Sequence, residues 1–157
     1  MCNIDEIMDM LDWNNSEAVQ QKGVELAKNI NNICAFVQPN APGKSVWENC
    51  ARIITDRSDD KLKPYLLQLL EWLQDMNWPG AEIIRERLKT YGEMEMLVFN
   101  VECCVEKAVA CGKFDEMKFL DNISELLDNK KLKMALSIKT LETLEKHYHN
   151  RGWWDEE

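Results

Sequence analysis

The sequence predicts an all-α protein with no sheet. Apolar residues recur at the three- and four-residue spacing of a helix along almost the whole chain, and the two-residue alternation typical of a strand is hard to find over any useful length. The chain has 157 residues, of which 45% are apolar and only 6 are glycine and 4 are proline, which is enough apolar material for one core. We therefore expect a single domain over residues 1–157, built from seven or eight antiparallel helices.

The N-terminal helices are expected from apolar stripes and capping signals. A first short stripe covers residues 4–11, and Asn14 followed by Glu17 fits an N-cap with an acid three residues later, which predicts the start of a second helix. Ser45 followed by Glu48 has the pattern of a capping box, so we expect a third helix to begin directly after this serine.

The later helices are expected from their apolar faces and from proline and glycine. Apolar residues from Leu62 to Leu73 cover most of the circumference of one helix, which should therefore lie in the middle of the packing. Pro79 forces Trp78 into an extended conformation and suits the first turn of a new helix, and Gly92 should end that helix. The main helices are expected at residues 16–31, 45–57, 61–74, 79–91, 93–111, 115–128 and 130–149.

Short loops between these helices indicate successive antiparallel pairs. A short HEAT-like α-solenoid and an irregular helical bundle are the two candidate architectures. The segment that follows Trp13 shares a few residue types with the segment that follows Trp78, as divergent helical-hairpin repeats would. This weak internal similarity favours the solenoid.

Three segments resemble a family of small bacterial proteins that is defined by a domain of unknown function. They are Leu70–Ala81 (LEWLQDMNWPGA), Leu11–Ser16 and Val46–Ala51. The likeness covers about Leu11 to Tyr91, and the remainder matches only in its helical character. The resemblance implies a HEAT-like, all-α fold and no catalytic residue. Small acidic helical proteins of this kind sometimes serve as immunity proteins that cap a toxin, which is an analogy at the level of the fold.

The charge of the chain indicates which partners to expect. There are 19 Lys and Arg against 28 Asp and Glu, a net charge of −9, and such a surface repels nucleic acids and anionic membranes. Only Arg85, Arg87 and Lys89 come close to a basic cluster. The chain starts without a secretory signal and has no apolar run of about 20 residues that could span a membrane, so we expect a cytoplasmic protein.

The cysteines and histidines were considered as metal ligands and nucleophiles. Cys103, Cys104 and Cys111 precede His147 and His149, but neighbouring cysteines point about 100° apart on a helix and lack the C-x2-C spacing of zinc sites. No catalytic signature surrounds a cysteine. We expect no metal, no cofactor, no enzymatic activity and reduced thiols at all six positions, which also include Cys2, Cys34 and Cys50.

The tryptophans have separate expected roles. Trp47 and Trp72 lie on apolar helical stripes and should be buried in the core. Trp13 and Trp78 precede helix starts, where a role in stapling the turn is favoured over a role in binding. Two more, Trp153 and Trp154, either cap the last helical hairpin or form an exposed aromatic and acidic tail.

We expect the protein to bind a basic protein partner through an acidic face. Asp75, Asn77 and Trp78 at one hairpin tip are the candidate contact residues, because loops on a rigid scaffold often carry function. The alternative is a small enzyme that uses Cys, His and Asp residues in a pocket between helices. A deep pocket where such side chains converge would favour the enzyme, and an open acidic face would favour the binding module.

Overall fold

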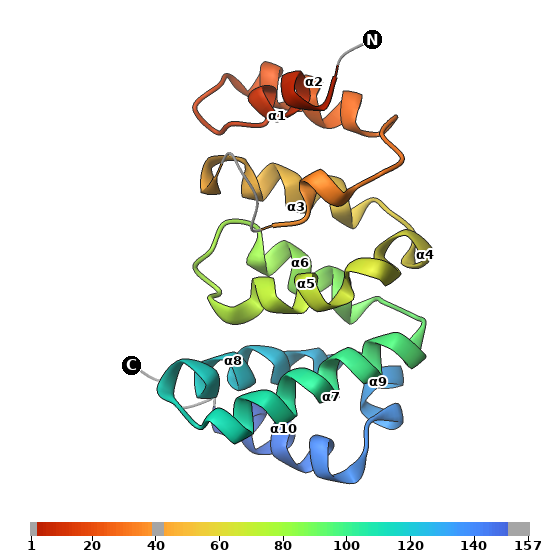
Figure 1. Cartoon of the computed structure of the whole chain (residues 1–157), viewed down its shortest axis with the longest axis vertical. Helices are drawn as coiled ribbons and strands as arrows, with labels where there is room; N and C mark the ends of the chain where they lie inside the picture. Colours follow the sequence, from red (N-terminus) through yellow and green to blue (C-terminus); the bar gives the residue numbers. More distant parts are fainter. Residues whose placement is uncertain (1–2, 39–42, 151–157) are drawn as a thin grey trace.

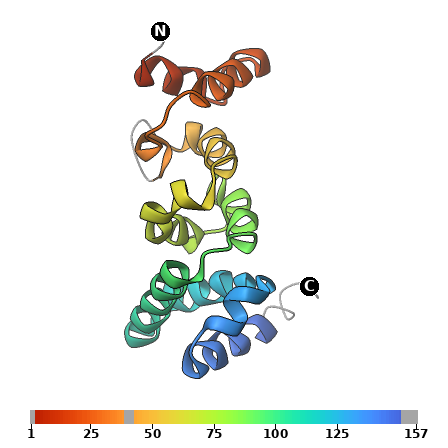
Figure 2. The same cartoon turned by 90° about the vertical axis from the view of Figure 1, so that its right-hand side faces the viewer.

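The computed structural model describes residues 3–38 and 43–150. All regular elements in these ranges are helices, which confirms the all-α prediction. They follow one another along the long axis of the molecule in chain order, from α1 (Ile4–Met10) and α2 (Glu17–Ala27) at one end to α7–α10 at the other (Figure 1). Figure 2 shows the same order of layers from the side.

Helices and short 3₁₀ turns alternate in the middle of the chain. The remaining elements are η1 (Cys34–Phe36), η2 (Lys44–Val46), α3 (Trp47–Thr55), α4 (Asp59–Leu62), η3 (Lys63–Tyr65), α5 (Leu66–Glu71), η4 (Trp72–Gln74), α6 (Ala81–Lys89), α7 (Met94–Cys111), α8 (Phe114–Ser124), η5 (Glu125–Asp128), α9 (Lys130–Ala135) and α10 (Ile138–Asn150). Within the part of the chain that the structure describes, no helix has the length and apolar character needed to cross a bilayer.

Two of the expected helices are divided. The helix predicted over 61–74 consists of α4, η3, α5 and η4, because Pro64 lacks an N–H group and falls in the first turn of η3. The helix predicted over 130–149 is interrupted at Leu136, whose backbone is extended at φ −68° and ψ 149°. The Ser137 hydroxyl then accepts a hydrogen bond from the Thr140 N–H at 3.3 Å and begins α10.

Two of the predicted helix caps were wrong. Ser16, not Asn14, caps α2, because its hydroxyl accepts a hydrogen bond from the Val19 N–H at 3.3 Å. Ser45 caps no helix: its hydroxyl donates to Asp12 Oδ2 at 3.1 Å, and its carbonyl oxygen accepts from the Trp13 N–H at 3.0 Å. Ser45 thus connects the segment after α1 to the start of α3.

Helices α3 and α6 pack closely against each other. Gly80 precedes α6 with φ +85°, and a Cβ atom built there would be 2.7 Å from Ala51 Cβ on α3, so only glycine fits. Trp72 and Trp47 are buried here as predicted, with exposed fractions of 1% and 6%. Trp13 is 51% exposed, so it does not act as the predicted staple.

Arg87 on α6 fixes the helix to the segment that leads into α4. Its Nη2 atom donates to Asp59 Oδ1 at 2.7 Å and to the Arg57 carbonyl oxygen at 2.9 Å. The other Asp59 oxygen, Oδ2, accepts from the Gly92 N–H at 2.9 Å. A single carboxylate therefore holds both Arg87 and the segment that follows α6.

The opposite side of α6 is bonded to the C-terminal layers. Arg85 forms an ion pair with Glu125 of η5, in which both side chains are nearly buried, and Lys89 Nζ lies 3.1 Å from Asp128 Oδ2. The Asn129 side-chain amide donates to the Tyr91 carbonyl oxygen at 2.8 Å. The basic residues Arg85, Arg87 and Lys89 are thus part of the packing between layers.

The pKa of the Asp59 carboxyl reflects these contacts. Burial raises this pKa, but the hydrogen bonds from Arg87 and Gly92 and the charges of Arg87 and Lys131 lower it by more, so it lies below the ordinary value. The ionised form therefore stabilises the fold at any pH above the unfolded-state pKa of about 3.9, and this contribution is lost as the pH falls through the lower folded-state value.

We expect Asp59→Asn to lower the free energy of unfolding by about 1–3 kcal/mol at pH 7, because it leaves Arg87 without its carboxylate. In urea unfolding followed by circular dichroism, the difference from wild type should shrink as the pH approaches about 3. The matched control is Glu82→Gln, since this side chain is 77% exposed and lies 3.8 Å from Arg85; it should cost less than about 0.5 kcal/mol. Equal losses for both variants would contradict the role of Asp59.

Candidate functional site

A groove of about 1660 Å³ lies along the C-terminal layers. Its walls come from the end of α5, from η4 and the turn that follows it, and from α7, α8 and the last turns of α10. The turn after η4 forms one edge of the groove, so the loop that the sequence singled out borders this groove.

Asp75, Asn77 and Trp78, the predicted contact residues, all line this groove. Asp75 Oδ1 accepts a hydrogen bond from the Asn77 N–H at 2.8 Å, which fixes the shape of the turn. Trp78 is half-buried and packs against the core, so only part of its ring is accessible from the groove.

The α7 wall of the groove carries three thiols. Cys103 and Cys111 are exposed, whereas Cys104 is buried. Burial is the main cause that raises the pKa of the Cys104 thiol to about 11, with a further contribution from Glu71. A thiol with this pKa stays protonated at neutral pH and is a poor nucleophile.

His147 of α10 also faces the groove, where it pairs with Asp121 of α8. The His147 Nδ1 and Asp121 Oδ1 atoms are 2.6 Å apart. This contact joins α10 to α8. Among the residues that the structure describes, no thiol is hydrogen-bonded to His147, and no group of three or more His, Cys, Asp and Glu side chains is placed to hold a metal ion. Cys2, the His149 side chain, Trp153 and Trp154 lie outside what the structure describes.

Carboxylates surround the groove and have few basic neighbours. The acidic lining residues besides Asp121 are Glu71, Asp75, Asp115 and Glu116. Over the described ranges, none of these four forms an ion pair with a basic side chain. The Oε2 atom of Glu116 is buried and accepts no hydrogen bond from the residues that the structure describes, although a buried carboxylate oxygen without a donor is costly.

Apolar side chains that reach the surface complete the lining. Phe114 is 69% exposed and Leu67 is 41% exposed, and both lie in the groove. Met76 and Met117 are partly buried beneath them, against the core. Sequence reasoning missed the α8 residues of the groove; the available signal was an exposed aromatic residue, Phe114, directly followed by two acids.

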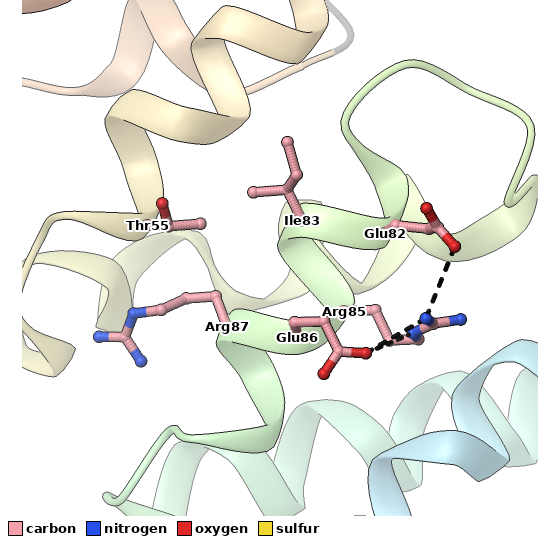
Figure 3. A pocket seen from close by; sticks show the side chains of 6 residues that line it. All are labelled: Thr55, Glu82, Ile83, Arg85, Glu86 and Arg87. Atoms are coloured by element: carbon pink, nitrogen blue, oxygen red, sulfur yellow. Dashed lines mark hydrogen bonds and ion pairs between the residues drawn. The ribbon is translucent and has the colours of Figure 1, made fainter.

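A smaller pocket of about 490 Å³ lies on the outer face of α6 (Figure 3). Figure 3 shows Arg85 and Arg87 directed to opposite sides of the helix, with Arg85 between Glu82 and Glu86. Both guanidinium groups are held by acidic neighbours, Arg87 by Asp59. This pocket therefore offers no cation that is available to an anionic ligand.

We expect the thiols to differ in reactivity according to their burial. In a short pulse of iodoacetamide at pH 8 on the folded protein, Cys103 and Cys111 should be modified well before Cys50 and Cys104, because burial raises the pKa of Cys50 to about 12 and that of Cys104 to about 11. Peptide mass mapping measures the order in which the cysteines are modified. The same pulse in urea should abolish the difference between exposed and buried cysteines. If Cys104 reacts as fast as Cys103 in the folded protein, the thiol is ionised and the enzyme alternative gains support.

Comparisons with known proteins place the chain in a family. A family model described as Domain of unknown function (DUF5071) matches residues 42–151, which include every groove residue named above. The match extends beyond Tyr91, where the expected likeness ended, and does not include residues 11–41. No curated protein and no solved structure matches the chain. Because the family model covers more than half of the sequence, the chain belongs to the family defined by Domain of unknown function (DUF5071).

Proposed function

We propose that the protein is a non-enzymatic binding module of the adaptor or immunity type, and that its groove holds a basic, amphipathic segment of a protein partner. One observation carries the proposal: exposed apolar side chains lie beside four carboxylates that have no ion-pair partner among the described residues, and one of them has a buried oxygen without a donor.

The apolar part of the groove suits the apolar face of a helix. Phe114 and Leu67 expose large surfaces, and Met76 and Met117 have flexible side chains that adapt to different partners. The volume of about 1660 Å³ exceeds the roughly 300–1,000 Å³ typical of small-molecule pockets. A peptide segment is therefore a better fit than a small metabolite.

The charge of the groove selects a basic partner. Glu71, Asp75, Asp115 and Glu116 face only two lysines in the lining, Lys107 and Lys118. A lysine or arginine of the partner would pair with these carboxylates, of which Asp115 is exposed. The net charge of −9 adds a long-range attraction that accelerates encounter with a basic surface.

The arrangement of the layers supports the proposal that the fold is a short HEAT-like solenoid. The helices are stacked along one axis in chain order, and stacked helical hairpins present extended surfaces that serve recognition (Figures 1 and 2). The groove then lies along the side of the C-terminal layers.

A small enzyme is the second candidate, favoured by the pair of His147 and Asp121 in a groove that also contains cysteines. Such a pair can orient a general base. The raised pKa of Cys104 and the absence, within the described residues, of a hydrogen bond between a thiol and His147 support this candidate less well than the binding module.

We expect a model peptide with leucine on one helical face and lysine on the other to bind the groove, and the same peptide with glutamate in place of lysine not to bind. Isothermal titration calorimetry should show weaker binding as NaCl is raised, because salt screens the attraction. Asp75→Asn and Glu116→Gln should each raise the Kd about two- to fivefold.

The matched control for this prediction is Glu82→Gln, which removes the same charge from the outer face of α6. It should leave the Kd within about twofold of wild type. If Glu82→Gln weakens binding as much as the groove variants do, the peptide responds to the net charge of the protein and the groove is not its site.

A further inference from the structure

Two tryptophans form a right-angled corner that holds the ammonium group of Lys44. The rings of Trp47 and Trp78 lie at 90° to each other with their centroids 5.6 Å apart. The Lys44 Nζ atom is 5.8 Å from the centroid of Trp47 and 5.7 Å from that of Trp78. Both distances are within the range of cation–π attraction, so one cation contacts two aromatic faces at once.

The corner is held in place by the core and not by Lys44. Trp47 belongs to α3 and has an exposed fraction of only 6%. It packs against the buried Trp72 with ring centroids 5.9 Å apart. Trp78 belongs to the turn that leads into α6, and Gly80 of the same turn packs against Ala51 of α3. The two rings are therefore fixed by the close contact between α3 and α6.

Lys44 can leave the corner at little cost. Lys44 is exposed and lies in the short turn η2, next to Gly43 at φ +135°. An exposed lysine loses little when water replaces the rings around its ammonium group.

We propose that the corner formed by Trp47 and Trp78 is a binding site for an alkylammonium group, that Lys44 is its internal occupant, and that a lysine of the partner takes the place of Lys44. This inference rests on the proposed function, because the partner of that function supplies the lysine. Trp78 connects the two sites, because its side chain both lines the groove and forms one wall of the corner.

Charge and shape favour an ammonium over other ligands. The ring faces of tryptophan are electron-rich and attract a cation without a hydrogen bond, so a quaternary ammonium binds as well as a primary one. Asp75 lies three residues before Trp78 in the same turn and lines the groove, which adds a negative charge to the approach.

The site is tested directly with choline and its neutral isostere 3,3-dimethylbutan-1-ol, using the indole N–H signals of Trp47 and Trp78 in NMR spectra. In Lys44→Met, choline should shift both signals, and in wild type the same shift should need several times more choline because Lys44 competes. The neutral isostere should shift neither. The proposal is wrong if the isostere acts like choline, or if choline moves neither signal in Lys44→Met.

The source of the ammonium group is tested with the leucine and lysine peptide. If a peptide lysine enters the corner, Lys44→Met should bind the peptide about two- to fivefold more tightly than Lys139→Met. Lys139→Met is the matched control, since it removes the same charge from an exposed position on α10. Trimethylation of the peptide lysines should preserve this difference between the two variants, because cation–π contact needs no N–H donor.

The two proposals fail separately. If the peptide binds equally to Lys44→Met and Lys139→Met, the groove binds the peptide but no partner lysine enters the corner, and this inference is overturned. If the peptide binds to no variant while choline shifts the signals in Lys44→Met, the proposed function fails and the corner is a site for a free quaternary ammonium compound.

Discussion

The contacts of α6 hold the stacked layers in order. Its apolar face packs on α3 so closely that Gly80 cannot carry a Cβ atom, and its cationic side chains reach acids on both neighbouring layers. Arg85 and Arg87 are each only 13% exposed, so removal of Glu125 or Asp59 would take away the acid that lies closest to a nearly buried charge. The side chains of this short helix therefore help to join α3 and α4 to the C-terminal layers.

This use of cations inside the fold determines the charge of the groove. The protein has nine fewer basic than acidic side chains, and the basic stretch Arg85–Lys89 is bonded between layers. Four carboxylates in the groove lining have no ion-pair partner among the residues that the structure describes. The cations of Arg85–Lys89 therefore pair with acids between the layers and not in the groove, which supports the proposed preference for a basic partner.

Local patterns predicted what depends on neighbours in sequence. Helical periodicity identified the helices and the burial of Trp47 and Trp72, and the turn after η4 was recognised by its proline and glycine. Predictions failed where a group distant in the sequence decides the outcome. The hydroxyl of Ser45, for example, donates a hydrogen bond to Asp12 and does not cap a helix. The groove was only partly predicted. Glu116 and Asp121 of α8 line it together with the predicted turn because of tertiary packing, and such packing leaves no periodic signal in the sequence.

The corner of Trp47 and Trp78 explains how one residue can serve both structure and binding. Sequence reasoning treated stapling and partner contact as alternatives for Trp78, but one side of its ring packs on Trp47 and another part lines the groove. Because the α3–α6 packing fixes both rings, exchange of Lys44 for another cation needs only a change in one exposed side chain. Recognition at this site would then require no rearrangement of the layers, and its energetic cost would be confined to releasing Lys44 and ordering the partner.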